Sequence, residues 1–295
     1  MIEHLHRQPA APSRVVVIGA GGFIGGTLVR QLAAADIPVL ALTRRDVDLL
    51  ARDASTRLRA LLRPTDSVVF ISAIAPVKTN AMLMQNLRMA EAACQALSDV
   101  PPAHLVYVSS DAVYADDANP VTERSPLAPS TLHGMMHAAR ELMLKSASTA
   151  PAAMLRPTLV YGAADPHNGY GPNRFRRQAA KGEPITIFGE GEERRDHVLV
   201  EDVARLAVLI LRHRSIGALN AVTGRSLSFD DIAHLVAAQF SPSAQVLSVA
   251  RPGPRPHLTH RHFDITDCMK AFPAFRYTDV ADGIAQTHRD MMGGI

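Results

Sequence analysis

The sequence predicts a doubly wound α/β fold with a smaller C-terminal domain that binds a substrate. Short runs rich in Val, Ile and Leu alternate with longer stretches of helical periodicity, the pattern of a parallel sheet covered by helices. These runs are apolar throughout, which suits strands buried on both faces. With 295 residues, of which 47% are hydrophobic and 20% charged, the chain is long enough for one large domain or two modest ones.

The expected elements alternate regularly up to residue 162. The predicted strands are Val15–Ile18, Val39–Thr43, Ser67–Ser72, His104–Ser109 and Ala153–Leu155. The predicted helices are Phe23–Ala35, Ala54–Leu62, Ala81–Leu97 and Leu132–Ser146.

Composition divides the chain into three parts. Residues 1–13 are rich in His, Pro and Ala and indicate a short disordered leader. Residues 14–162 carry the alternating pattern and form the nucleotide-binding domain. From about Tyr161 the chain becomes richer in Gly, Pro and Arg. We therefore expect residues 163–295 to form mainly the substrate-binding domain, with some segments returning to the large sheet.

Charge and cysteine content restrict the partners and the compartment. The net charge is only +3, and no run of Lys and Arg is long enough to follow a nucleic-acid backbone. Cys94 and Cys268 lack a paired spacing, which favours a reducing, cytoplasmic compartment. The apolar stretch 15–32 could imitate a signal peptide, but its regularly spaced glycines argue against one. No run of eighteen uninterrupted apolar residues elsewhere indicates a membrane span.

A glycine-rich turn follows the first predicted strand and opens the first predicted helix. Gly19 permits the tight turn, Gly22 lets the backbone approach a pyrophosphate, and Gly25 allows close packing of the helix. Phe23 and Ile24 complete the turn, and the helix N-terminus offers N–H groups to the phosphates. The sequence therefore predicts a Rossmann domain that binds NAD or NADP, and no metal.

The end of the second strand bears on the choice between the two dinucleotides. An acidic residue at this place suits a free ribose 2′-hydroxyl, whereas arginine accommodates a 2′-phosphate. Arg44 and Arg45 stand here, with Asp46 and Asp48 slightly later. This order favours NADP; the alternative is that both arginines are solvated and NAD binds.

Several segments together resemble the extended short-chain dehydrogenase/reductase family. They are the Gly19-x-x-Gly22-x-x-Gly25 turn, Val106–Tyr114, Pro120–Glu123, Leu155–Gly162, Ile187–Gly191, Arg195–Asp196 and Val200–Ala204. The likeness runs from Val15 to about Thr287. It implies an NAD-dependent epimerase, dehydratase or 4-keto reductase that acts on a nucleotide-linked sugar, with hydride passing between the sugar, at C4, and the nicotinamide.

The resemblance also implies which residues contact the ligands. At the cofactor it places Asp48, Leu49, Ser72, Ala73 and Pro157 beside the glycine turn. For the nucleoside diphosphate it points to Arg195, whose guanidinium offers a planar fork of donors, and to Asn173 and Arg174 at the start of a helix. The alternative for the arginines is a solvated surface.

The main departure from this family is its Tyr-x-x-x-Lys pair, which this chain lacks. His133 and His137 occupy the two positions, beside a matching Gly134. Because the ordinary pKa of histidine is about 6.5, His133 can act as general acid and base without help. Ser110 would orient the substrate oxygen and Asp111 would serve as a second acid. His137, one turn along the helix, would bind the nicotinamide ribose.

Three other interpretations of the histidine pair remain open. The protein could bind NAD(P) or a sugar nucleotide without turnover and act as a regulatory or partner subunit. The two histidines could share a cation, although no third ligand stands at a clear spacing. They could also be ordinary polar helix residues.

A homodimer is the expected assembly. Relatives use the helices that correspond to Ala81–Leu97 and Leu132–Ser146 to pair as a four-helix bundle. Methionine side chains would give such a surface adaptable apolar contacts, or they could belong to the core. These methionines are Met82, Met84, Met89, Met135, Met136 and Met143.

Overall fold

A seven-stranded sheet forms the centre of the larger lobe in this computed structural model, which describes residues 2–251, 253 and 258–293. The strand order is β1-β10-β6-β5-β4-β2-β3, and every strand except β1 runs parallel to its neighbours. The predicted doubly wound sheet is confirmed. The strands are β1 (Ile2–His4), β2 (Val15–Ile18), β3 (Val39–Leu42), β4 (Ser67–Phe70), β5 (His104–Val108), β6 (Ala152–Pro157) and β10 (Ser215–Ala221).

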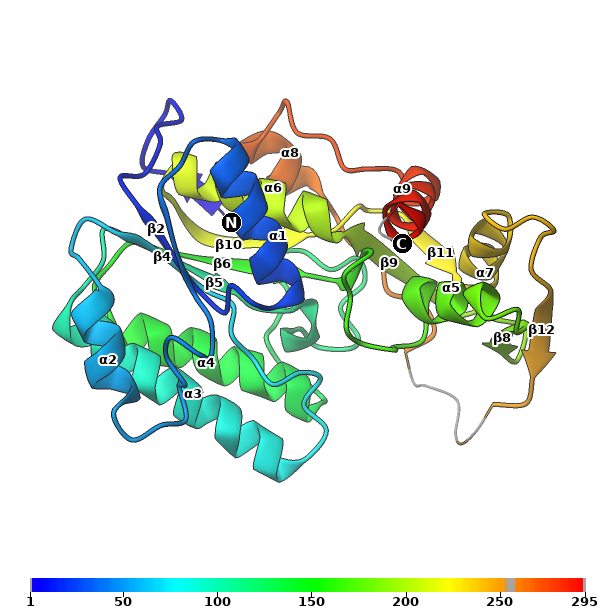
Figure 1. The fold of residues 1–295 in the computed structure, drawn as a ribbon, viewed down its shortest axis with the longest axis horizontal. Helices are drawn as coiled ribbons and strands as arrows, with labels where there is room; N and C mark the ends of the chain where they lie inside the picture. Colours follow the sequence, from blue (N-terminus) through cyan, green and yellow to red (C-terminus); the bar gives the residue numbers. More distant parts are fainter. Residues whose placement is uncertain (1, 252, 254–257, 294–295) are drawn as a thin grey trace.

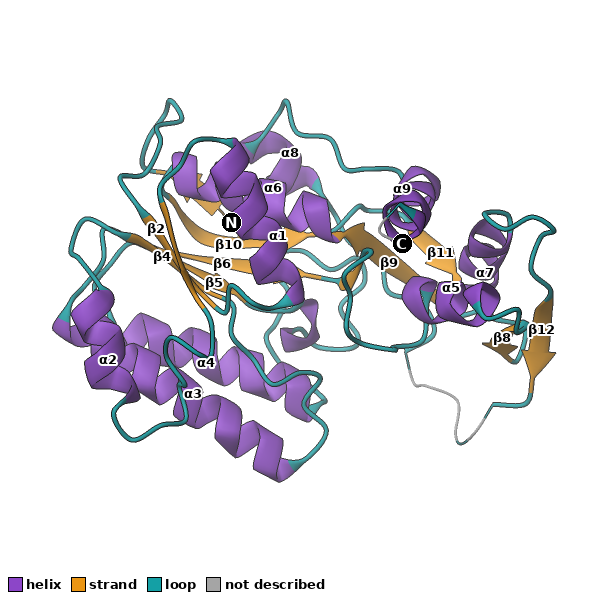
Figure 2. Ribbon diagram, viewed as in Figure 1, coloured by secondary structure: helices purple, strands orange, loops and turns teal. Residues whose placement is uncertain are grey.

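Helices cover both faces of this sheet, as Figures 1 and 2 show. On one face lie α1 (Phe23–Ala34), α6 (Val200–Arg212) and α8 (Thr266–Ala271). On the other lie α2 (Ala54–Leu61), α3 (Asn80–Asp99) and α4 (Leu132–Ala147). The predicted bounds of the strands and helices before residue 163 agree with these within two residues.

The central strands are buried on both faces, as their continuous apolar sequences predict. All residues of β2, β4 and β5 are buried, including Val16, Val68 and Leu105, which have no exposed surface. Val17 and Val106 belong to the apolar cluster under α1 and α6, whereas Val16 and Leu105 belong to the cluster under α3 and α4. Alternate residues of each strand therefore point to opposite faces of the sheet and pack against different layers of helices.

A smaller lobe begins at β7 and has its own apolar core around Phe175, Ile185 and Ile232. Its elements are β7 (Leu159–Tyr161), α5 (Pro172–Ala180), β8 (Ile185–Phe188), β9 (Arg194–Leu199), β11 (Ser226–Ser228), α7 (Phe229–Ala237), β12 (Val246–Val249) and α9 (Val280–Met292). The chain also returns to the larger lobe after residue 163, where it forms α6, β10 and α8 (Figure 1). The chain after residue 163 thus contributes elements to both lobes.

The start of the chain differs from our expectation of a disordered leader over residues 1–13. Ile2–His4 form β1, which pairs antiparallel with β10 at the edge of the sheet. Ile2 is buried, and the His4 ring contacts Ser215 Oγ at 2.8 Å and the Ala271 carbonyl at 2.9 Å. The strand forms because β10 otherwise presents an unpaired edge, a partner that lies too far along the chain for local sequence to reveal.

Two further observations concern cysteines and membrane spans. Cys94 and Cys268 are both free and buried. In the described ranges, no helix combines the length and the apolar character needed to cross a bilayer. The cytoplasmic location stays a prediction.

Candidate functional site

The glycine-rich turn joins β2 to α1, and two of its glycines leave no room for a side chain. Gly19 has a φ of +103°, and a Cβ there would lie 2.7 Å from the backbone nitrogen of Ser72. At Gly25 a Cβ would lie 2.1 Å from the Gly19 carbonyl oxygen. Both contacts are with backbone, so neither can be relieved by moving a side chain. The start of α1 is thereby held against the ends of β2 and β4.

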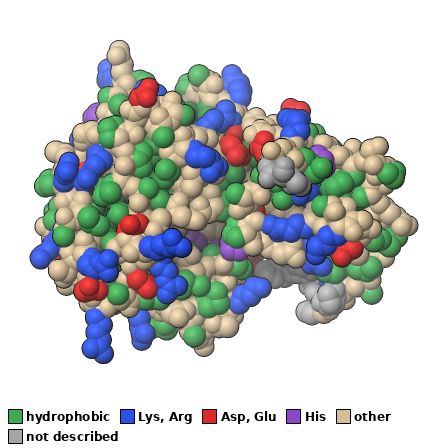
Figure 3. Space-filling model, in the orientation of Figure 1, with side chains coloured by type: hydrophobic (Ala, Val, Ile, Leu, Met, Phe, Trp, Pro, Cys, Tyr) green, Lys and Arg blue, Asp and Glu red, His purple; other side chains and the backbone are tan. Residues whose placement is uncertain are grey.

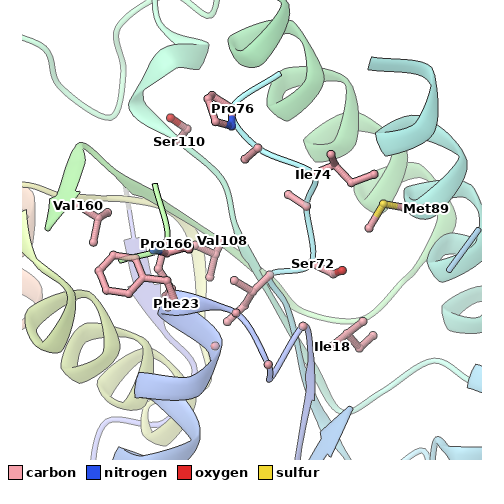
Figure 4. Close-up of a pocket in the computed structure, with 18 of the residues that line it drawn as sticks. Ile18, Phe23, Ser72, Ile74, Pro76, Met89, Val108, Ser110, Val160 and Pro166 are labelled. Atoms are coloured by element: carbon pink, nitrogen blue, oxygen red, sulfur yellow. The ribbon is translucent and has the colours of Figure 1, made fainter. Parts of the chain in front are cut away.

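A cavity of about 1080 Å³ opens at the carboxyl ends of the parallel strands, where ligands bind in doubly wound folds. Figure 4 shows Phe23, Ser72, Met89 and Ser110 around it, and Figure 3 shows a hollow between the two lobes with histidine side chains inside. All the predicted cofactor residues line it: Gly19, Gly22, Phe23, Ile24, Gly25, Arg44, Arg45, Asp48, Leu49, Ser72, Ala73 and Pro157. The predicted catalytic residues Ser110, Asp111, His133 and His137 line it too.

The loop after β3 presents both acidic and basic side chains to one end of the cavity. Asp46 accepts hydrogen bonds from the backbone N–H and the hydroxyl of Thr43, at 2.8 and 2.7 Å, and these bonds lower the pKa of its carboxyl group. Asp48 pairs with Arg44 at 3.2 Å. Both carboxylates therefore have partners within the loop, whereas no such contact of the Arg45 side chain is found within the described ranges.

The N-terminus of α4 places His133 in the cavity. The hydroxyl of Thr131 caps the helix by accepting the N–H of Gly134 at 3.1 Å. A Cβ at Gly134 would lie 1.9 Å from the carbonyl oxygen of Ala112, so glycine lets α4 approach the segment after β5. Burial, and next to it the charge of His167, lower the pKa of His133.

His137 lies one turn further along the same helix and is more deeply buried. The centroids of its ring and the His133 ring are 4.8 Å apart, in an edge-to-face arrangement. Its Nδ1 lies 2.7 Å from the hydroxyl oxygen of Tyr107 on β5. Burial, followed by the charges of His133 and Arg140, lowers its pKa well below the ordinary value. In the part of the chain that the structure describes, no group of three potential ligands could hold a metal ion.

Ser110 and Asp111 follow β5 and line the same cavity as the two histidines. The Ser110 hydroxyl accepts the N–H of Ala112 at 3.2 Å and begins a short 3₁₀ helix, η1 (Asp111–Val113). The Asp111 carboxylate lies 3.7 Å from the guanidinium of Arg261. Burial raises the pKa of Asp111, and the charge of Arg261 opposes that rise. A protonated form of this carboxyl group is therefore easier to reach than in a solvated aspartate.

A second, smaller cavity of about 270 Å³ adjoins Asp111. Arg195 and Arg261 both line it, together with Thr158 and Asp196. Arg195 donates to the carbonyl oxygens of Leu258 and Thr259, at 2.5 and 3.3 Å, and lies 3.6 Å from Glu193. Of the residues predicted to bind substrate, Arg195 is thus the one that the fold brings beside the catalytic candidates.

Asn173 and Arg174 lie at the start of α5, but their side chains contact other residues of the protein and not the two cavities. The Asn173 side chain is buried and donates to Asp165 at 2.7 Å. The Arg174 guanidinium lies over the rings of Tyr170 and Phe188. Neither residue is among those described that line the two cavities. Their role toward substrate stays a prediction.

Several residues at the site escaped the sequence analysis. Arg140 is fully buried in α4 and donates to the carbonyl oxygens of Ser72 and Asn86, at 2.8 and 2.6 Å. It thereby ties the histidine helix to the loop after β4. Arg261 and Tyr107 were missed as well, because nothing in the local sequence of either indicates which side chain it meets.

Comparison with known proteins agrees with this architecture. The sequence profile of the NAD dependent epimerase/dehydratase family matches residues 15–222. A curated relative, ADP-L-glycero-D-manno-heptose-6-epimerase of Alkalilimnicola ehrlichii, is 28% identical over 270 residues, 75% of this chain and 79% of that protein.

Two solved structures share the fold at low sequence identity. A GDP-L-fucose synthetase from Naegleria fowleri bound to NADP is 17% identical, with a TM-score of 0.84 over 99% of this chain and 97% of that one. The Thermus thermophilus UDP-glucose 4-epimerase complex with NAD is 24% identical, with a TM-score of 0.80 over 96% of this chain and 100% of that one. Given the matched profile over most of its length, the chain belongs to the NAD dependent epimerase/dehydratase family.

Proposed function

We propose that this protein uses a nicotinamide dinucleotide to modify a nucleotide-linked sugar, as an epimerase, 4-keto reductase or dehydratase, with histidine in place of the usual tyrosine. The observation that carries the proposal is a single cavity lined by the glycine turn, by Ser110 and by His133. The relatives support the substrate class, because their names contain ADP-, GDP- or UDP-linked sugars. The bound NADP and NAD of two of them support the cofactor.

The proposed chemistry divides between the ligand and the side chains. The nicotinamide, when bound, supplies or accepts the hydride. Ser110 orients the sugar oxygen, and His133 exchanges the proton of that oxygen. Since the pKa of His133 is lowered, its neutral form prevails near neutral pH and can accept the proton of a carbinol. Asp111, whose pKa is raised, is the second acid of the site.

Arg195 is the proposed contact for the diphosphate. It lines the smaller cavity, which shares Asp111, Thr158 and Leu159 with the larger one. A sugar that lay between the two cavities would join a diphosphate near Arg195 to the reacting carbon near His133. The guanidinium offers the fork of donors that such an anion requires.

The test is turnover with NADPH or NADH and panels of ADP-, UDP-, dTDP- and GDP-sugars, following nicotinamide absorbance and sugar products together. His133→Phe should lower kcat by about 10²–10⁴ while leaving cofactor affinity unchanged, because it removes only the proton donor. His234→Phe, on an exposed part of α7, is the matched control and should retain full activity. Full activity of His133→Phe would remove this histidine from the mechanism.

A second candidate function is binding without turnover, as a regulatory or partner subunit. It is favoured by one observation, that the sequence contains no Tyr-x-x-x-Lys pair. Tight binding of cofactor and sugar nucleotide with no product across the panel would support this alternative and exclude the enzymatic one.

Of the two dinucleotides NAD and NADP, NADP is the proposed cofactor. Asp46 and Asp48 are engaged by Thr43 and Arg44, which leaves Arg45 as the basic group at the cavity rim for a 2′-phosphate. Arg45→Ala should weaken NADPH binding by about tenfold and leave NADH binding unchanged, since one charge-assisted contact is removed. Equal losses for both dinucleotides would contradict this preference.

A homodimer through α3 and α4 is the proposed assembly. Met84, Met135 and Leu142 are exposed there, at 50%, 47% and 68%, whereas Met89 and Met136 are buried in the core. The exposed side chains support an apolar contact surface on these two helices, and the buried methionines belong to the core. Leu142→Glu should convert a dimer to a monomer in sedimentation, because it places a charge on that apolar face. A wild-type monomer at micromolar concentration would refute the assembly.

A further inference from the structure

Tyr107 is a buried side chain beneath the histidine pair that the proposed chemistry does not use. It lies on β5, is 1% exposed, and its hydroxyl oxygen is 2.7 Å from Nδ1 of His137, which is 6% exposed. The ring centroids are 5.8 Å apart, so the two side chains also pack against each other. A hydrogen bond this far from solvent fixes both of its partners.

The direction of this hydrogen bond follows from the surroundings of the tyrosine. Burial raises the pKa of Tyr107, so its hydroxyl keeps its proton. The neighbouring Arg140 guanidinium has no lone pair and can only donate to that oxygen. Within the described ranges, His137 Nδ1 is the one acceptor found for the tyrosine O–H. Tyr107 therefore donates, and Nδ1 is the unprotonated nitrogen of the ring.

We infer that Tyr107 is a positioning residue that holds His137 in its neutral form, with the proton on Nε2 and available to the cavity. The inference rests on the proposed function, because it gives His137 a role in it. A neutral Nε2–H is an uncharged hydrogen-bond donor where relatives have a lysine ammonium, suited to a hydroxyl of the cofactor ribose.

The neutral state of His137 matters for its neighbour. The rings of His133 and His137 are 4.8 Å apart, so a charge on His137 would oppose protonation of His133. The titratable and charged groups facing His137 are Tyr107 from β5 and His133 and Arg140 from α4. Around them, Glu141 of α4 faces Tyr107, Cys94 of α3 faces Arg140, and His167 faces His133. With His137 neutral, His133 can take up and return a proton.

The test is nitrogen-15 NMR of the histidine side chains in the full chain, because nitrogen shifts separate the two neutral forms from the charged one. His137→Gln identifies the His137 signal. In the wild type we expect the Nε2–H form of His137, with no titration between about pH 5 and 8. In Tyr107→Phe the ring loses its partner, and we expect a mixture of the two neutral forms. The matched control is Tyr114→Phe, another fully buried tyrosine, which contacts Arg156 and Asn220 instead.

The outcomes separate this inference from the proposed function. An Nδ1–H or charged His137 in the wild type, or an unchanged His137 signal in Tyr107→Phe, would overturn the inference whatever the activity. If the signal changes as expected but no sugar nucleotide is turned over, the positioning role stands and the proposed reaction fails. If both hold, Tyr107→Phe should lower kcat/KM about tenfold and move the pH profile, whereas Tyr114→Phe should leave that profile in place.

Discussion

Removing the carboxylate of Glu141 is expected to destabilise the fold strongly. This side chain on α4 is 1% exposed and pairs with Arg156 on β6, which is 3% exposed. Its oxygens accept from Arg156 Nε at 2.8 Å, from Arg156 Nη2 at 2.6 Å and from the Ser109 hydroxyl at 2.7 Å. Glu141→Leu removes all three bonds and leaves the guanidinium buried without a counter-charge.

The magnitude follows from these contacts. Three hydrogen bonds to a charged group, at about 1.5–3 kcal/mol each, set an upper range of about 4.5–9 kcal/mol. Breaking one side of a buried pair costs about 3–5 kcal/mol in comparable cases, and we expect a loss in that range for Glu141→Leu. Each kcal/mol lowers the Tm of a chain of this size by about 2–4 °C, so the Tm should fall by about 6–20 °C.

The assay is urea and thermal unfolding followed by circular dichroism, with a double-mutant cycle. Arg156→Met alone should also cost several kcal/mol, because it strands the Glu141 carboxylate. The free energy of unfolding of the double variant Glu141→Leu/Arg156→Met should fall by less than the sum of the two single losses. The difference should be about 2 kcal/mol or more, since the double variant leaves neither charge unpaired. A single loss below about 1 kcal/mol, or strict additivity in the cycle, would refute this reasoning.

Three further outcomes follow from particular contacts. Gly25→Ala should weaken NADPH binding at least about tenfold, because its Cβ would lie 2.1 Å from a backbone oxygen; Gly26→Ala, with 3.5 Å to its nearest atom, should bind normally. Burial lowers the pKa of His104 to about 4, so the unfolded chain binds the proton more tightly and stability falls between about pH 6.5 and 4. Between pH 7 and 5 the wild type should lose about 2 kcal/mol more than His104→Gln, and equal losses would contradict this. Ser228→Ala should cost about 1 kcal/mol by removing the capping box of α7, measured against exposed Ser243→Ala, which should be neutral.

The bounds of five strands of the large sheet, β2 to β6, could be predicted because their signal is local, whereas β1 and β10 were not predicted. The strands β2, β4 and β5 are apolar at every position, and the helices between them carry their own periodicity and caps. The same holds for the glycine turn, where Gly19 and Gly25 are required by close backbone contacts within the turn and with Ser72 after β4. The predicted cofactor residues that line the cavity lie in these segments or in the loops that follow β3 and β4.

The substrate side of the site was less predictable from sequence. Asn173 and Arg174 stand at the start of a helix, a position that favours binding of an anion. In the fold, however, Asn173 donates to Asp165, and the Arg174 guanidinium lies over two aromatic rings. The sequence pattern could not distinguish an anion site from an internal contact, because both use the same residue types. Arg195 lines the smaller cavity because β9 and the residues near Leu258 fold together there.

The sequence by itself determined the alternating elements, the glycine turn, and the absence of a Tyr-x-x-x-Lys pair, since each is written in a short stretch of chain. Tertiary structure alone decided that Ile2–His4 extend the sheet, that Arg261 faces Asp111 and that Tyr107 bonds His137. These contacts join residues separated by 30 to more than 200 positions. The physical reason is that a buried polar group or an open strand edge takes whichever partner the packing brings to it, and local sequence does not record that partner.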